Sequence, residues 1–277
     1  MSEIALALRQ VRYENRAFWR NPIAAFFTFF FPLMFMIIFN VLFGGTSGIG
    51  GGLRVADFYT PAVIVFGVIT ATYTNIAMTI TVARDLGILK RMRGTPLPPW
   101  AFMAGRILHS VLLAFILVVI VSAFGAIFYS VHLPWDRLPA VLLTLAVSAA
   151  TFCALGLAIA GLVPNADSAP AIVQFSILPL NFISNVFVDM RDAPAWINTV
   201  SKIFPIRHFA DAMLGIWNPF TPGNGFYWGD LAAIAAWGVA GVLVAVRFFT
   251  WEPRAYGLGG VPAPAVTLPG SGKRRAM

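Results

Sequence analysis

The feature that most constrains this chain is a series of long apolar runs that hold almost no charged side chain. A helix needs about 20 consecutive apolar residues to cross about 30 Å of hydrocarbon. Runs near this length lie at residues 22–43, 58–82, 107–129, 139–163, 171–188 and 229–249. Only 11% of the residues are charged, whereas soluble domains have about a quarter. We therefore predict an all-α integral membrane protein with six transmembrane helices, in a domain that covers residues 22–251.

A polar stretch interrupts the apolar pattern between the second and third runs. Residues 84–106 read RDLGILKRMRGTPLPPWAFMAGR, with one acid, Asp85. The cations of the stretch are Arg84, Lys90, Arg91, Arg93 and Arg106. Hydrocarbon does not solvate such a cluster, so the stretch must lie in water or at the membrane surface. We predict a short cytoplasmic helix here, which receives force from a separate soluble partner.

The distribution of Lys and Arg predicts the orientation, because cytoplasmic loops carry an excess of these residues. With the N-terminus inside, the cytoplasmic segments hold 14 of the 19 Lys and Arg residues. The other 5 are Arg54, Arg137, Arg191, Lys202 and Arg207, all in external segments. We therefore expect a multi-pass protein of the cytoplasmic (plasma) membrane with both termini in the cytoplasm. The net charge of +8 then orients the chain in the lipid bilayer, and no nucleic-acid partner is predicted.

The two ends of the chain lie outside the predicted spans. Residues 1–21 place Arg9, Arg12, Arg16 and Arg20 at steps of three and four, with apolar residues on another face. This pattern is typical of an amphipathic helix in the membrane interface, and a solvated helix that only supplies positive charge is the alternative. We expect no cleaved signal peptide before the first span. Residues 252–277 are rich in Pro and Gly and are predicted to form a disordered cytoplasmic tail.

The segment 189–228 is too long and too apolar for a simple external loop. It contains two short stretches, PAWINTVSKIF and PIRHFADAMLGIW, and each opens with a proline, which suits the first position of a helix. Each apolar piece is near a dozen residues and therefore too short to span the membrane. We predict an external re-entrant helix pair between spans five and six, and an amphipathic loop on the lipid headgroups is the alternative.

The motifs of a catalytic or cofactor site are missing from the sequence. There is no Walker phosphate loop and no GxSxG nucleophile elbow. His109, His132 and His208 are expected far apart, and Cys153 is the single cysteine, so no metal site is predicted. No Asp, Glu, Lys or Arg lies deep within a predicted span, where ion-coupled transporters place such groups. We therefore predict a protein that is not an enzyme and that takes its energy from outside the membrane.

Amides are the remaining polar side chains of the spans. Gln174, Asn181 and Asn185 are spaced by seven and four, so we expect one helical face to carry all three, with Ser184 beside them. Asn75 lies in the second span. Such residues can line a substrate path, or they can hydrogen-bond neighbouring helices. The sequence leaves both interpretations open.

Three stretches resemble the membrane subunit of a type-2 ATP-binding-cassette exporter, a group that exports drugs, polysaccharides and lipids. The stretch RDLGILKRMRGTPLPPWAFMAGRI is similar to the coupling helix of that family, which docks into a cleft of the ATPase. VPNADSAPAI resembles the connection between spans four and five, and PAWINTVSKIFPIRHFADAMLGI resembles the external re-entrant pair. The sequence departs from the family at Asp85, where glutamate is common, and at Pro205-Ile206, where Asn-Pro-Leu is frequent.

The resemblance implies roles for particular residues and partners. The coupling helix would comprise Arg84, Asp85, Gly87, Lys90, Arg91, Arg93, Gly94, Thr95 and Pro96, with Arg84 and Asp85 in contact with the ATPase. The re-entrant gate would comprise Pro205, Arg207 and His208. The implied partners are a separate ATP-binding cassette ATPase, which holds the ATP and magnesium, and a second copy or a related membrane subunit. This chain itself would bind no cofactor, and it would move an amphipathic or hydrophobic, drug-like or lipid-like substrate outward.

Two other classes of function remain as alternatives. A passive channel or membrane scaffold would need no ATPase and would pass substrate alone. An intramembrane enzyme would need a general base within the spans, where only hydroxyls, amides and Cys153 are available.

Overall fold

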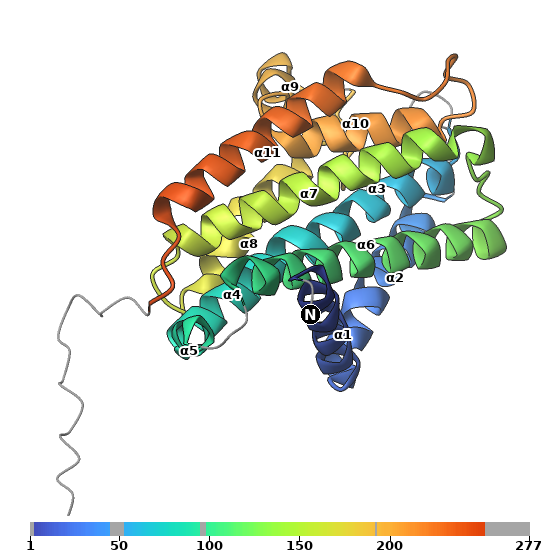
Figure 1. Cartoon of the computed structure of the whole chain (residues 1–277). Coiled ribbons are helices and arrows are strands. Elements are labelled where there is room, and N and C mark those ends of the chain that lie inside the picture. The colour runs from blue at the N-terminus through green and yellow to red at the C-terminus, as the bar shows by residue number, and fades with distance from the viewer. Residues whose placement is uncertain (1–2, 45–52, 95–97, 192, 253–277) are drawn as a thin grey trace, which may run out of the picture.

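The computed structural model describes residues 3–44, 53–94, 98–191 and 193–252 as a bundle of helices (Figure 1). Their bounds are α1 (Glu3–Trp19), α2 (Pro22–Phe43), α3 (Val55–Ile69), α4 (Asn75–Asp85), α5 (Ile88–Arg93), α6 (Pro99–Tyr129), α7 (Leu138–Leu162), α8 (Ala169–Phe182), α9 (Ala195–Ser201), α10 (Pro205–Trp217) and α11 (Trp228–Phe248). A π-helical turn, η1 (Thr70–Thr74), joins α3 to α4, and a 3-10 turn, η2 (Trp135–Arg137), precedes α7.

Five helical segments of the described chain are long and apolar enough to cross a membrane. They are Pro22–Phe43, Val55–Asp85, Trp100–Tyr129, Trp135–Leu162 and Trp228–Phe248. The second is α3, η1 and α4 read as one continuous rod. The predicted all-α class is confirmed, and helices of sufficient length and apolarity lie at five of the six predicted places. The glycine-rich loop 45–52 and the predicted tail after residue 252 lie outside the described residues.

The fifth predicted span, 171–188, is shorter in the structure. Helix α8 has 14 residues and ends at Phe182, which gives a length of about 21 Å at 1.5 Å per residue. The chain then turns, and Asn185 takes a left-handed conformation with φ of 59°. The side chain of Asn185 stabilises the turn, because its Oδ1 accepts a hydrogen bond of 2.8 Å from the Met190 amide. The prediction that Asn185 shares a helical face with Gln174 and Asn181 is therefore wrong.

The third predicted span begins earlier than expected. Helix α6 starts at Pro99 and has 31 residues, so Arg106 lies within it rather than in a loop. A proline suits this first helical position, because its missing N–H needs no partner there. The charge of Arg106 is paired, since its Nε lies 3.1 Å from Oε1 of Glu14 on α1. Only residues 86–98 therefore separate spans two and three.

Helix α3 occupies the centre of the bundle. All 15 of its residues are buried. Figure 1 shows it between and behind α7 and α6, and α10 also packs against it. Its core contacts include Leu117 and Val121 of α6, Phe152 of α7 and Phe209 of α10. In contrast, α2 leaves most of its apolar side chains exposed, as a helix that faces lipid or another subunit does.

One end of the bundle gathers α5, the start of α6 and the end of α11, and we name it the α5 end. Leu89 of α5 is fully buried against Phe102 of α6, and Phe249 and Trp251 pack on the same cluster. Helix α1 crosses the start of α6 at a steep angle (Figure 1). Its Gln10 leaves no room for a side chain at Gly105. The opposite end, which holds the start of α11 and the end of α10, is named the α10 end.

The contact between α7 and η1 generates a stability prediction. A β-carbon added at Gly156 would lie 2.7 Å from the carbonyl oxygen of Tyr73, so Gly156→Ala must push α7 away from the π-helical turn. We expect this change to lower the free energy of unfolding by about 1–3 kcal/mol. Thermal unfolding of the purified chain in detergent measures the effect.

The control is Gly229→Ala, because nothing lies within 4 Å of the β-carbon it would add. Alanine favours a helix over glycine by up to about 1 kcal/mol, so the control should unfold at the same or a slightly higher temperature. Equal melting temperatures for the two variants would contradict the close approach of α7.

Candidate functional site

The first candidate site is the basic corner, which we define as residues 84–94: the end of α4, the turn at Leu86 and Gly87, and α5. Gly87 has φ of 66°, a left-handed conformation that favours glycine, and it lets α5 begin directly after α4 ends. Leu89 fixes α5 on the bundle because its side chain is fully buried. The corner is therefore a packed element and not a solvated loop.

Arg84 turns into the protein, which differs from the expectation that it faces an ATPase. Its side chain is 1% exposed. Its Nη1 donates a 2.7 Å hydrogen bond to the carbonyl of Ala160, and its Nη2 donates one of 2.6 Å to the carbonyl of Val163. The last carbonyls of a helix have no partner within the helix, so the guanidinium satisfies the C-terminal end of α7.

Asp85 joins the basic corner to the connection between α7 and α8. Its Oδ2 accepts a hydrogen bond of 2.5 Å from the amide of Ala166. Asn165 shapes the same connection, because its Oδ1 accepts from the Ser168 amide at 2.8 Å. The sequence suggested two separate motifs at residues 84–106 and 163–172, and the structure places them in direct contact.

The outer face of α5 carries the exposed charges of the corner. Lys90, Arg91 and Gly94 are exposed. Arg91 also donates a 3.1 Å bond to the carbonyl of Leu86, which holds its guanidinium near the turn. The predicted coupling residues Thr95 and Pro96 lie outside the described residues, as does the side chain of Arg93.

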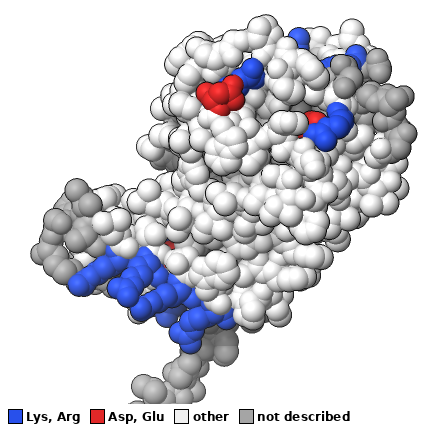
Figure 2. Space-filling model, turned by 90° about the vertical axis from the view of Figure 1, so that its right-hand side faces the viewer, with Lys and Arg blue, Asp and Glu red and all other residues white. Residues whose placement is uncertain are grey.

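The cations at the two ends of the bundle differ in their partners. At the α5 end, Arg9, Arg12, Arg16, Arg20 and Lys90 are exposed, and no ion pair links them to an acid within the described part of the chain. Figure 2 shows a row of Lys and Arg along the lower edge of the molecule, with almost no acid beside it.

At the α10 end, three arginines are held by acids or carbonyls, whereas Lys202 is exposed and makes no ion pair among the described residues. Arg54 lies 2.7 Å from Asp57, and Arg207 lies 2.7 Å from Asp211. Arg137 donates to the carbonyls of Ile216, Asn218 and Thr221. Among the described residues, the α5 end therefore presents more exposed cations without an acid partner than the α10 end does.

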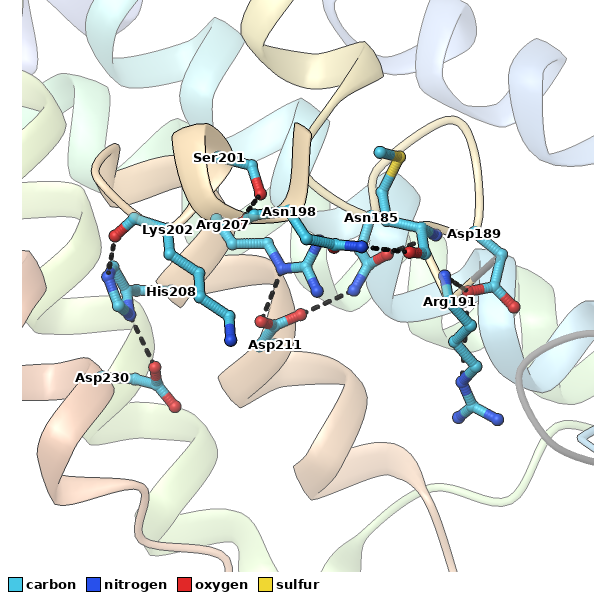
Figure 3. Close-up of polar contacts among 11 residues, drawn as sticks. Asn185, Asp189, Arg191, Asn198, Ser201, Lys202, Arg207, His208, Asp211 and Asp230 are labelled. Atoms are coloured by element: carbon cyan, nitrogen blue, oxygen red, sulfur yellow. Dashed lines mark hydrogen bonds and ion pairs between the residues drawn. The ribbon is translucent and has the colours of Figure 1, made fainter. Parts of the chain in front are cut away.

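The second candidate site is a polar network at the α10 end, shown in Figure 3. The predicted gate residue Arg207 donates from Nε to Asp211 Oδ2 at 2.7 Å and from Nη1 to Asn198 Oδ1 at 3.3 Å. Asn185 donates to the other carboxylate oxygen of Asp211 at 2.7 Å. Asn198 also donates to the carbonyl of Met190 at 3.0 Å. The network thus ties α9, α10 and the turn after α8 together.

His208 fixes α10 to α11 and to the connection that precedes it. Its Nδ1 lies 2.7 Å from Asp230 Oδ1 on α11, and its Nε2 lies 2.8 Å from the carbonyl of Lys202. A carbonyl oxygen only accepts, so Nε2 donates that bond. Pro205 begins α10 and is buried. The three predicted gate residues therefore lie close together on the first turn of α10.

The predicted path residues do not form one lining. Asn75 donates to Ser110 of α6 at 3.3 Å, and Gln174 is exposed on α8. Asn181 and Ser184 are buried, and Asn181 donates to the carbonyl of Ile177 in its own helix. Asn185 belongs to the Arg207–Asp211 network instead. These positions favour helix packing for Asn181.

The sequence interpretation missed the acids that complete the second site. Asp211 lies four residues after Arg207, and this spacing on a helix is a signal that predicts an ion pair. Asp230 and Asn198 carried no comparable signal, because only the tertiary fold brings them to His208 and Arg207. Among the described residues, no group of three His, Cys, Asp or Glu side chains is placed to hold a metal ion.

Comparisons with known proteins agree on one kind of relative. The model of the family "ABC-2 type transporter" matches residues 8–217. The "Inner membrane transport permease YadH" of Escherichia coli K12 is 26% identical over 189 residues, which is 66% of this chain and 72% of that protein.

Two further relatives carry names that concern drugs. The "Daunorubicin resistance ABC transporter permease protein DrrB1" of Streptomyces coeruleorubidus is 25% identical over 199 residues, 71% of this chain and 69% of that protein. The "Probable multidrug ABC transporter permease YbhR" of Escherichia coli K12 is 26% identical over 156 residues, 56% of this chain and 42% of that protein.

The contacts of Arg84 generate a second prediction. Arg84→Gln cannot reach both carbonyls at the end of α7, and a buried carbonyl without a partner costs about 1–3 kcal/mol. We expect a loss of that size in the free energy of unfolding, measured by thermal unfolding in detergent. Lys90→Gln is the matched control, because Lys90 is exposed and its loss should change stability by less than about 0.5 kcal/mol. Similar losses for the two variants would be incompatible with the buried contact.

The second site generates a third prediction. Asp211→Asn removes the charge that Arg207 and Asn185 share, so α9 and α10 should open more often. Hydrogen–deuterium exchange of residues 195–217 should rise by about tenfold or more, as expected when a partly buried charged hydrogen bond is lost. Asp136→Asn is the control, because Asp136 is 81% exposed and its nearest cation atom is 3.8 Å away. Unchanged exchange in Asp211→Asn would show that the network does not hold α10.

Proposed function

The chain belongs to the ABC-2 type transporter family as a membrane permease subunit, and from this premise we propose that it exports an amphipathic or hydrophobic substrate with energy from a separate ATPase. Permease subunits of this family lack an ATPase domain and work with an ATP-binding subunit. The names of DrrB1 and YbhR concern drug resistance and multidrug transport. Those names support a drug-like cargo for this chain.

The exposed cationic face of α5 is the observation that carries the proposal. Lys90 and Arg91 point outward from a helix whose opposite face is fixed by the buried Leu89. A helix that transmits force must not move relative to the bundle, and close packing of its side chains prevents that movement. In this proposal the ATPase presents acidic residues to α5, while ATP and magnesium bind to the ATPase alone. Arg84 and Asp85 do not contact the ATPase in this proposal. They bind the end of α7 and the connection after it, and so hold the basic corner on the bundle.

The hydrogen bonds of Arg84 and Asp85 provide the route from the ATPase into the membrane. A displacement of α5 would move α4 directly, because Gly87 alone separates the Leu86 cap of α4 from α5. The same displacement would reach the connection between α7 and α8 through the bonds to Val163 and Ala166. Spans two, four and five would therefore respond together, which is what a rigid-body change between two states requires.

We place the α5 end in the cytoplasm, with both termini on that side. Arg9, Arg12, Arg16, Arg20 and Lys90 are exposed at this end, and such an excess of Lys and Arg is typical of the cytoplasmic side. The amphipathic helix α1 would lie in the cytoplasmic interface, and α9 and α10 would form the external re-entrant pair. Pro205, Arg207 and His208 would then hold the outer gate closed until the spans move.

A second copy or a related subunit would complete the substrate path. Helix α2 exposes Phe26, Phe27 and Phe30, and α8 exposes Gln174 and Phe175. Exposed aromatic surface of this extent is typical of a face that meets a partner or lipid. We place the path between the α2 and α8 faces of two subunits, with Gln174 as a polar group along it.

A charge reversal on α5 tests the proposal. Lys90→Glu combined with Arg91→Glu should abolish co-purification with the ATP-binding cassette ATPase and reduce export by about tenfold or more, because like charges would meet at the contact. The readouts are the yield of ATPase in a pull-down and the efflux of a fluorescent amphiphile from cells.

The matched control reverses Arg9 and Arg12 on α1, which carry the same charge but lie on another helix. This control should still recover the ATPase. If the α5 variant binds and exports normally, α5 is not the coupling element. Passive flux through vesicles that contain only this chain would instead support a channel.

A further inference from the structure

A cavity of about 380 Å³ lies at the α5 end between α1, α2, α4 and α6, and neither the coupling nor the gate uses it. It is lined by the corner between α1 and α2, by η1 and the start of α4, and by one face of α6. Asn21 and Thr79 form part of its wall and are exposed, whereas His109 and Ser110 are buried. The cavity therefore leads from the surface to a polar interior.

Two buried nitrogen atoms of α6 lack a hydrogen-bond partner in the described structure, and both residues line this cavity. They are Nε2 of His109, whose residue is 6% exposed, and Nη1 of Arg106. The two residues are three apart and so share a helical face. An unsatisfied buried donor is costly, and each such group in a protein calls for a partner.

The surrounding contacts hold these two groups in place. The Nε of Arg106 donates to Glu14 at 3.1 Å, and Gln10 donates to the same carboxylate oxygen at 2.9 Å. The ring of His109 packs edge-on against Phe18, with centroids 5.8 Å apart. Both donors share Oε1 of Glu14, which also lines the cavity, and Nη1 of Arg106 is left without an acceptor among the described residues.

The chemistry of the lining favours an anion that carries hydroxyl groups. Arg106 and His109 can both donate to a phosphate oxygen, and bonds to a charged acceptor are about twice as strong as neutral ones. The hydroxyls of Thr28, Thr70 and Thr79 donate to carbonyls of their own helices, so their oxygens are left as acceptors. A volume of about 380 Å³ exceeds what a lone phosphate needs.

The cavity lies near exposed arginines of α1, which attract anionic lipids, and near exposed phenylalanines of α2, which can contact acyl chains. Arg12, Arg16 and Arg20 on α1 are exposed, and each basic residue near a surface attracts anionic lipid by about 1 kcal/mol. Phe27 and Phe31 lie three residues after Ala24 and Thr28 of the cavity wall, and they are 58% and 37% exposed. Chains of an amphiphile can pack against these rings on the same side of α2.

We propose that this cavity binds the phosphate headgroup of an anionic amphiphile from the leaflet on the α1 side, with the phosphate between Arg106 and His109. A phospholipid of the bilayer and a phosphorylated cargo share this chemistry. The inference does not rest on ATPase coupling, because its test needs only the purified chain.

The test measures which phospholipid the full chain retains. The chain is reconstituted in vesicles of phosphatidylcholine and phosphatidylglycerol, extracted in mild detergent and examined by native mass spectrometry. We expect the natural chain to retain phosphatidylglycerol in preference to phosphatidylcholine. His109→Leu should retain about tenfold less phosphatidylglycerol, because one hydrogen bond to a charged group is lost. It leaves the Arg106–Glu14 pair intact, and thermal unfolding in detergent verifies that the variant folds.

Two further variants make the result specific. His109→Gln restores a side-chain N–H donor and should recover part of the retention. His132→Leu is the matched control, because His132 is exposed and does not line the cavity, and it should retain lipid as the natural chain does. If His109→Leu and the natural chain retain the same phosphatidylglycerol, the cavity holds water only and the proposal fails. Equal competition by inorganic phosphate would overturn the amphiphile assignment and leave a simple phosphate site.

Discussion

A charge in the middle of a bilayer costs about 2.5–3.5 kcal/mol or more unless it reaches water or a partner, and the ends of these helices are arranged around that cost. The buried Arg84 illustrates the solution at the α5 end, where its guanidinium meets the carbonyls that α7 cannot satisfy itself. Arg207 illustrates it at the α10 end, where Asp211 and Asn198 accept its donors. Between the two ends, the spans rely on apolar packing around α3.

The two polar ends differ in what they offer to the surroundings. At the α10 end, acids pair with Arg54 and Arg207 and carbonyls accept from Arg137, so most of the arginines there have partners within the chain. At the α5 end, the contacts of Arg84 and Asp85 face inward while Lys90 and the arginines of α1 face outward. A family of transporters whose energy comes from another subunit needs one end that is open to a partner, and the asymmetry of charge matches that need.

Much of this fold could be predicted from the sequence, because length and apolarity alone define a membrane span. The bounds of α2 agree with the prediction to the residue, and those of α7 and α11 differ by one. The early end of α8 could not be predicted, since Asn185 reads as one more helical position until its contacts with Met190 and Asp211 are seen. The inward orientation of Arg84 could not be predicted for the same reason. The sequence shows only a cation near the end of a helix, and the carbonyls of α7 that bind it are brought close by the tertiary fold.

The π-helical turn η1 has a consequence for how a push on α5 would travel through the second span. In such a turn the hydrogen bonds run from residue i to i+5, so one extra residue is accommodated without breaking the rod. Tyr73 of this turn bonds Ser176 of α8 at 2.6 Å, and Gly156 of α7 lies against its backbone. If the extra residue of the π-helical turn shifts by one position, α4 must rotate about the helix axis relative to α3. A displacement along the axis of α4 would then become a rotation of α4 next to α8, while α3 keeps its position in the core.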